Sequence, residues 1–290
     1  MAKSESIGRR WWFHIALAVL GSVLVLFVLA PLIGMFVTTS LSELSQAARD
    51  RLVLESIEVT LTAALWATLA CTVVGVPLAY LLARKSFPGR SLLLAIIDLP
   101  IAIPHTVAGI ALLTVIGRQS WFGQRFGGGL VGTKIGIAVA MAFVSLPFLV
   151  NAAREGFETV PVRLEKAART LGASPRQVFF TISLPLAWRG IVSGMSLMWA
   201  RGISEFGAVI IIAYYPMTTP VLVYQRLNDY GLSYARAAAV LLVLVCVAVF
   251  AFLRFLSRPP QHSRGREQPP LSRPPKQGRE HDNHRGDHRA

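Results

Sequence analysis

Two charged residues, Arg201 and Glu205, stand in the middle of an otherwise apolar segment, and their side chains are the best placed in the sequence to do chemistry. A spacing of four residues puts both on one face of a helix, within reach of an ion pair. An ionisable group at mid-depth in a membrane is costly and usually faces a bundle interior or a water path. The pair predicts either a translocation path or gate, or a structural ion pair that orients its helix.

Elsewhere the sequence offers little that suits catalysis or metal binding. The polar residues of the apolar segments occur singly, and Cys71 and Cys246 lack the spacing of a metal or redox motif. The glycine-rich stretch 127–134 follows no predicted strand and has no Lys directly after its last Gly, which argues against a phosphate-binding loop. We therefore expect no catalytic residue, no metal and no cofactor on this chain.

The apolar residues are concentrated in six blocks. Hydrophobic residues make up 53% of the 290 residues and charged residues only 15%, which is too apolar for a soluble domain. Most blocks approach the ~20 residues that cross a bilayer as a helix. They cover residues 12–36, 59–82, 92–116, 135–150, 191–213 and 237–255. The sequence therefore predicts an all-α polytopic membrane protein with six spans in residues 12–256.

The two ends of the chain and the loops carry most of the charge. Residues 257–290 are rich in Pro, Arg and His and nearly lack apolar side chains, which predicts a disordered basic tail. Such a tail suits contact with anionic membrane lipid, and no aromatic residue interleaves its arginines as nucleic-acid binding would require. Lys and Arg are more frequent in the loops on one side of the predicted spans, and positive residues favour the cytoplasmic side of a membrane. We therefore expect a multi-pass protein of the cell membrane with residues 1–11 and the tail in the cytoplasm.

The third apolar block contains two prolines, Pro100 and Pro104. Each removes a helix hydrogen bond, so we expect a kinked or broken helix there. Irregular backbone in a membrane is tolerated only where it packs in protein or lines a cavity. We expect the neighbouring Asp98 to lie near the cytoplasmic end of the span, within reach of lipid headgroups.

A polar, arginine-rich hairpin of two short helices is predicted at residues 164–185, between long apolar blocks. Pro161 suits the first turn of a helix, and Gly172 suits the left-handed position that ends it. Ser174 is a favoured N-cap and Pro175 a favoured first residue for a second helix. Two capped helices are more than a connection between spans needs, and they indicate a docking element.

The hairpin resembles the EAA loop of ATP-binding-cassette (ABC) importer permeases. The family pattern is matched by Ala167, Ala168, Gly172, Ile182, Leu184 and Pro185. Lys166 occupies the position of the family's Glu, and Glu165 comes directly before it. The resemblance implies that the loop, residues 154–189, seats in a cleft of an ATPase subunit and that these eight residues couple its motion to the membrane.

A second resemblance covers the segments ARGISEFGA and YYPMTTPVLVY, which are similar to those of molybdate and tungstate importer permeases. Related sulfate permeases share the triplet Glu205-Phe206-Gly207. The resemblance implies a type I ABC importer permease fold and adds Phe206 and Gly207 to the path or gate candidates, beside Arg201, Glu205, Pro100 and Pro104.

The partners follow from the same resemblance. It implies a homodimer of permeases, two copies of an ATPase subunit and an extracytoplasmic oxyanion-binding protein, with ATP hydrolysis confined to the ATPase. A sulfate or other anion ABC permease is the alternative. An ATP-independent secondary transporter would typically show repeated halves with paired broken helices, and the sequence shows one interrupted segment and no convincing repeat. A membrane enzyme would need clustered catalytic groups, which the sequence lacks.

Overall fold

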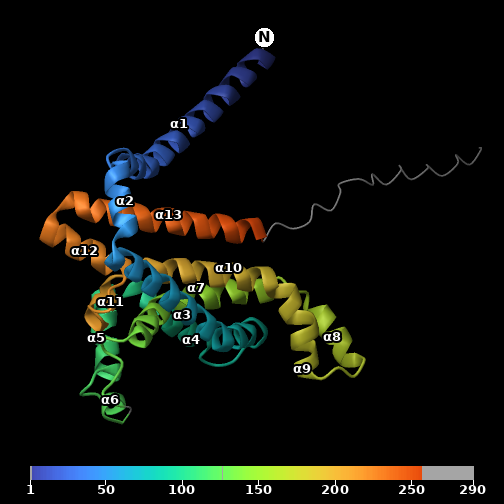
Figure 1. Ribbon diagram of the computed structural model, residues 1–290. Coiled ribbons are helices and arrows are strands. Elements are labelled where there is room, and N and C mark those ends of the chain that lie inside the picture. Colours follow the sequence, from blue (N-terminus) through green and yellow to red (C-terminus); the bar gives the residue numbers. More distant parts are fainter. Residues whose placement is uncertain (1, 126, 257–290) are drawn as a thin grey trace, which may run out of the picture. The chain divides into compact units, whose positions relative to one another are not determined.

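The computed structural model describes residues 2–125 and 127–256, and every regular element in these ranges is a helix (Figure 1). The prediction of an all-α chain is confirmed, and the predicted tail 257–290 lies outside the described residues. In chain order the elements are α1 (Ala2–Val37), α2 (Leu41–Arg49), α3 (Arg51–Arg84), α4 (Arg90–Ala102), α5 (His105–Ile116), α6 (Trp121–Arg125), α7 (Lys134–Glu158), α8 (Val162–Thr170), α9 (Pro175–Val178), the π-helical segment η1 (Phe179–Ser183), α10 (Leu184–Ile203), α11 (Gly207–Ile212), α12 (Thr219–Tyr230) and α13 (Leu232–Leu256).

Five helical segments are long and apolar enough to cross a membrane, and a bent pair supplies a sixth if it forms one span. The bent pair, Arg90–Ala102 and His105–Arg125, turns through 113°. Within the described ranges the unbroken segments are Trp11–Val37, Arg51–Arg84, Lys134–Glu158, Pro175–Ile203 and Leu232–Ala251. The chain is therefore a multi-pass membrane protein, and the prediction of six spans holds if the bent pair crosses the bilayer as one.

The turn between α4 and α5 has its cause at Pro104. Ile103, which precedes this proline, takes the extended backbone (φ −81°, ψ 144°) that a following proline favours, and α4 ends there. Pro104 itself occupies the position before the first residue of α5. The predicted break is thus confirmed at Pro104, whereas Pro100 lies buried within α4.

The fifth predicted span, 191–213, is wrong in both of its bounds. The helix starts earlier, at Pro175, and ends at Ile203, so that Arg201 lies in the last turn of α10. Glu205 lies beyond the helix, in the link before α11. Its carboxylate accepts a hydrogen bond from the amide of Ala208 at 2.9 Å, which satisfies a free N–H group in the first turn of the next helix. Arg201 and Glu205 therefore stand at a helix break and not at the centre of a continuous span.

The core of the molecule forms where α7 packs against α3 and α10. At the crossing of α7 and α10, two glycines face each other, and a Cβ atom added to Gly190 would lie 2.6 Å from the Cα atom of Gly156. Only glycine permits helices to approach this closely, and such contacts are typical of helix packing in membranes. Large apolar side chains fill the layers on either side, among them Met141, Leu149 and Phe157.

α1 differs from the other spans because the apolar window of its span is 0% buried. Its side chains from Trp11 to Val37 are almost all exposed. The surface of this helix is left free for lipid or for another chain.

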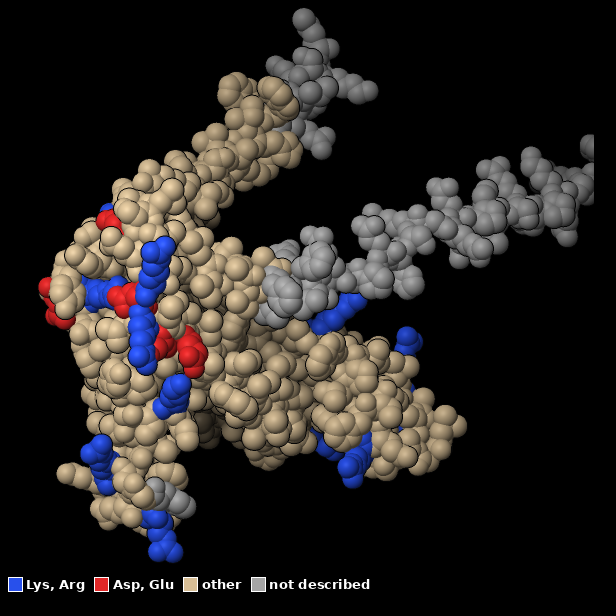
Figure 2. All heavy atoms as spheres, in the orientation of Figure 1, with Lys and Arg blue, Asp and Glu red and all other residues tan. Residues whose placement is uncertain are grey.

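Opposite charges lie over α2, α12 and the start of α3 (Figure 2). Asp50 accepts a hydrogen bond from the Leu52 amide and one from Arg226, which ties the start of α3 to α12. Burial pushes the pKa of Asp50 upward, but the Arg226 guanidinium and the backbone amides outweigh it, and the pKa lies below its usual value of 3.8. Arg236 and Glu43 form a second, longer pair at 3.7 Å, between α13 and α2.

Candidate functional site

The predicted hairpin of two helices is present, and its first helix ends as expected. Gly172 takes the left-handed conformation, with φ +90°. Its N–H group donates to the carbonyl of Arg169, and the N–H group of Ala173 donates to the carbonyl of Ala168, both at 3.0 Å. This is the hydrogen-bond pattern of a Schellman motif, which closes a helix firmly.

The second helix of the hairpin also begins as predicted, but it does not end where a short helix would. The Ser174 hydroxyl accepts from the Gln177 amide at 3.3 Å, and the Gln177 side chain accepts from the Ser174 amide at 2.8 Å. This reciprocal capping box starts α9, with Pro175 in its first turn. From there the helix runs on through η1 into α10, as one segment to Ile203. The second arm of the hairpin is thus the end of a membrane span.

The exposed surface of the hairpin lies on the side of α8 that points away from Glu165. Successive helical residues are turned by about 100°, so residues 163, 167 and 171 gather on the face opposite Glu165. We call five of the exposed residues the docking face: Arg163, Leu164, Lys166, Ala167 and Leu171. Leu171 is 89% exposed, which is unusual for a leucine at the end of a capped helix.

The remaining residues of the family pattern lie at the edge of this face or in the second arm. Gly172 is exposed and Ala168 is half-buried. In the second arm, Ile182 and Leu184 are half-buried, whereas Pro185 is exposed.

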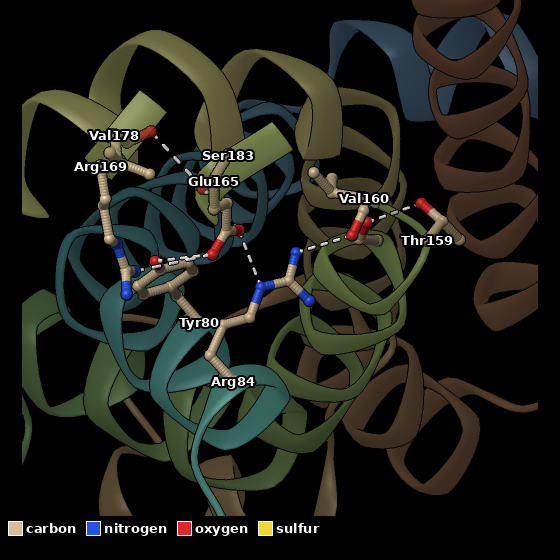
Figure 3. A network of polar contacts seen from close by, with 9 residues as sticks. Tyr80, Arg84, Thr159, Val160, Glu165, Arg169, Val178 and Ser183 are labelled. Carbon is tan, nitrogen blue, oxygen red and sulfur yellow. Dashed lines mark hydrogen bonds and ion pairs between the residues drawn. The ribbon is translucent and has the colours of Figure 1, made fainter. Parts of the chain in front are cut away.

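Glu165 was predicted to act with the docking residues, but its side chain points into the molecule. It is 2% exposed, and one carboxylate oxygen accepts from Arg84 Nε and from Ser183 Oγ, each at 2.8 Å (Figure 3). The other oxygen lies 3.4 Å from the Tyr80 hydroxyl and 3.8 Å from Arg169. Arg84 also donates to the carbonyl of Val160 at 2.9 Å. We call Glu165, Arg84, Ser183 and Tyr80 the junction.

The second group of candidates meets where two helix breaks come together. Arg201 Nη2 lies 2.9 Å from Glu205 Oε2 and 2.8 Å from His105 Nε2, and Arg201 Nη1 lies 3.2 Å from Ser204 Oγ. His105 Nδ1 is 3.7 Å from the same Glu205 oxygen. Because arginine only donates, the ring nitrogen of His105 that it contacts must act as an acceptor. We call Arg201, Glu205, His105 and Ser204 the break cluster.

The starts of α5 and α11 are in backbone contact beside this cluster. A Cβ atom added to Gly207 would lie 2.8 Å from the Cβ atom of His105, so only glycine fits at this position. Phe206 is half-buried, and its ring centroid lies 5.1 Å from that of Tyr224. Through His105, the start of α5 thus lies next to the guanidinium of Arg201. Of the two prolines, Pro104 borders the cluster, and Pro100 lies about one turn earlier in α4.

Sequence reasoning missed five of these residues: His105 and Ser204 in the break cluster, and Arg84, Ser183 and Tyr80 in the junction. His105 directly follows Pro104, and a polar residue at the first position of a broken membrane helix was the available signal. Arg84 and Ser183 carry no such signal, because they meet Glu165 only through the folding of distant segments. Asp98, expected near lipid headgroups, accepts a hydrogen bond from Asn151 at 2.7 Å and so links α4 to α7.

Known proteins resemble this chain over most of its length. The molybdate/tungstate transport system permease protein of Pyrococcus furiosus is 45% identical over 250 residues, covering 86% of this chain and 96% of the relative. The probable sulfate transport system permease protein of Chlorokybus atmophyticus is 36% identical, covering 85% of this chain and 88% of the relative.

A solved structure shares the fold. It is that of a bacterial alginate ABC transporter in complex with a periplasmic protein bound to an alginate pentasaccharide, and it superposes with a TM-score of 0.66 at 18% identity. The match covers 88% of this chain and 96% of that one. The fold is that of the type I ABC importer permeases. Residues 75–259 match the family model of the inner membrane component of binding-protein-dependent transport systems, and the chain belongs to this family.

Proposed function

We propose that this chain is the permease subunit of an ATP-driven importer for tungstate or molybdate. It works as a homodimer in the cell membrane, with both termini in the cytoplasm. Two ATPase subunits bind and hydrolyse ATP, and an extracytoplasmic binding protein delivers the oxyanion. The permease itself contributes no catalytic residue and no cofactor. The observation that carries the proposal is the docking hairpin, an exposed element whose two helices are capped on either side of their turn and whose second helix is continuous with a membrane span.

The docking face indicates what its partner surface offers. Arg163 and Lys166 are exposed on it, while Glu165, the acidic residue of α8, is buried and paired inside the molecule. Figure 2 shows Lys and Arg but no Asp or Glu on the visible side of the α8–α9 end. Leu164 and Leu171 add apolar surface. The matching cleft on the ATPase therefore has an acidic rim and an apolar floor.

The break cluster supports a role on the translocation path. The start of α5 contributes a partial positive charge that attracts anions, and Arg201 adds a full one. Glu205 balances that charge, so the attraction is weak, which allows an anion to pass without being held. Phe206, Gly207, Pro100 and Pro104 shape the two breaks around it. The corresponding cluster of the second copy forms the other wall of the path.

The 36% identity to a probable sulfate permease favours one second candidate, a sulfate importer. Tungstate, molybdate and sulfate are all tetrahedral dianions, so the break cluster would meet each of them with similar charge. Selection among them is expected to reside mainly in the binding protein.

The test is ATP-dependent uptake by the reconstituted system. The permease is placed in liposomes with its ATPase, and binding protein loaded with tungstate is added on the side from which it delivers. Uptake that requires ATP, and that molybdate competes for better than sulfate, supports the proposal. Uptake that persists without the ATPase would instead indicate a secondary transporter, and preferential competition by sulfate would indicate the second candidate.

A further inference from the structure

The junction ties three parts of the chain together at one buried carboxylate. Glu165 belongs to α8, Arg84 is the last residue of α3, and Ser183 ends η1 just before α10. The side chains of Arg84 and Glu165 are 9% and 3% exposed. A charge-assisted hydrogen bond that is shielded from water in this way is stronger and more directional than one at the surface.

The π-helical segment brings Ser183 into this position. The N–H group of Leu184 donates to the carbonyl of Phe179, five residues back, so this hydrogen bond encloses one residue more than that of an α-helix does. Ser183 is fully buried and reaches Glu165 from this segment. Such π-segments occur frequently at functional sites, and here the segment lies between the docking hairpin and a membrane span.

Aromatic rings close the junction from the side of α3 and α7. The ring of Tyr80 contacts those of Phe157 and Phe179 at centroid distances of 5.2 and 4.9 Å, both edge to face. The hydroxyl of Tyr80 points to Glu165 (Figure 3). The rings exclude water from the carboxylate and restrict how far it can move.

We infer that the junction is a latch that makes the docking hairpin move as one body with the ends of α3 and α10. Glu165 and Arg84 are then positioning residues for transport. Without them, the links 159–161 and 171–174 could absorb a displacement of α8. With them, the displacement passes into α10. The last turn of α10 carries Arg201, which lies about 27 Å from Ser183 along the helix, at 1.5 Å per residue. This inference rests on the proposed function, because the ATPase is the source of the displacement. The rigidity of the latch, however, can be measured in the permease without any partner.

The first experiment tests that rigidity without any partner. Spin labels are attached at Leu171→Cys, the C-cap of α8, and at Val73→Cys on α3, both exposed positions. The protein is full-length permease whose Cys71 and Cys246 are replaced by Ala. We expect a narrow distance distribution in the parent and a clearly broader one in Glu165→Gln, which leaves Arg84 without its charge partner. An equally narrow distribution in Glu165→Gln overturns the latch.

Two further variants guard against a general loss of folding. Ser183→Ala removes one hydrogen bond of the junction without leaving a buried charge, and it should broaden the distribution in the same direction but less. The double variant Arg84→Glu with Glu165→Arg restores a pair of opposite charges and should make the distance distribution narrow again. The matched control is Glu55→Gln, which breaks the exposed pair with Arg51 and should change nothing. Broadening in the control as large as in Glu165→Gln overturns the inference.

The second experiment uses permease, ATPase and binding protein in liposomes, and it measures tungstate moved per ATP hydrolysed. In Glu165→Gln this ratio should fall about tenfold or more, a coupling loss within the usual allosteric range. Co-purification of the ATPase and basal hydrolysis should remain. Proportional loss of transport and hydrolysis overturns the latch as a coupling device. Failure of the unmodified permease to bind an ATPase would instead overturn the proposed function, and the spin-label result would still decide the latch.

Discussion

The junction and the break cluster, both built around a buried carboxylate and an arginine, are built in opposite ways. In the junction, each oxygen of Glu165 has a partner, and both members of the ion pair are almost fully buried. In the break cluster, the side chain of His105 is 43% exposed and that of Arg201 22%. Glu205 is buried and ion-paired, yet its Oε2 atom makes no hydrogen bond of good geometry to any part of the chain that the structure describes.

This difference indicates different tasks. A fully satisfied buried network is rigid, because every rearrangement leaves a group without a partner. The break cluster lies at two helix breaks and its histidine and arginine are partly exposed, so fewer contacts hold it in one arrangement. The junction therefore suits transmission of a displacement, and the break cluster suits a gate that rearranges when the displacement arrives.

The largest effect is expected at the ion pair of the break cluster. Arg201→Met leaves Glu205 as an uncompensated buried charge, which costs about 3 kcal/mol or more of stability. Glu205→Gln should impair assembly in the same way, and the double variant should recover much of it. Thermal stability of the purified permease measures the cost.

Transport then separates the two interpretations of the pair. A gate predicts that the double variant assembles, hydrolyses ATP and moves little oxyanion. A purely structural pair predicts that uptake returns with assembly. Normal transport by both single variants would show that the pair has no role in function.

A smaller effect is expected at Gly172, and it tests the geometry of the hairpin on which the junction acts. Valine at φ +90° costs about 1–2 kcal/mol and moves the chain away from the left-handed turn. We expect Gly172→Val to insert in the membrane but to lose substrate-stimulated ATP hydrolysis. The control is Gly172→Asn, because asparagine tolerates this conformation, and it should retain most of the stimulation. Unchanged stimulation in Gly172→Val with normal assembly would remove the docking assignment.

The smallest effect is expected at the partly exposed pair of Asp50 and Arg226, which sets a scale for the junction and the break cluster. The pKa of Asp50 is held below its usual value by Arg226 and backbone amides, despite burial that opposes this. Its stabilisation is therefore complete above the usual pKa of 3.8 and is lost as the pH falls through the lowered value. Because Asp50 is partly exposed, we expect Asp50→Asn to cost less than about 1 kcal/mol at neutral pH.

Melting curves at decreasing pH check this prediction. The difference between the parent and Asp50→Asn should shrink in acid and vanish below the lowered pKa. A difference that grows in acid would contradict the sign of the shift.

The sequence predicted the local signals of the fold well. Gly172 and Ser174 act as caps because their conformations and hydrogen bonds depend only on neighbouring residues. Pro104 breaks the third block for the same reason. The end of α10 was missed because apolar residues continue past it, and the capping of α11 by Glu205 becomes visible only in three dimensions.

The junction could not be predicted from the sequence. Helical periodicity fixes which residues of α8 share a face, but it does not say which face meets the body of the protein. Glu165 is separated from Arg84 by 81 residues and from Ser183 by 18, and neither spacing carries a pattern. For this reason the sequence favoured Glu165 as a docking residue, whereas the structure buries it.

The most direct test of coupling between the junction and the break cluster measures how accessible position 204 is during ATP turnover. Ser204 is an exposed residue of the break cluster. A cysteine at this position, in permease without its native cysteines, is modified by a membrane-impermeant thiol reagent in the reconstituted importer. We expect the modification rate to change with ATP by about tenfold, within the usual range of allosteric coupling, and Glu165→Gln to abolish this change. An equal ATP-dependent change in both proteins would contradict the claim that the junction carries motion from the docking hairpin to the break cluster.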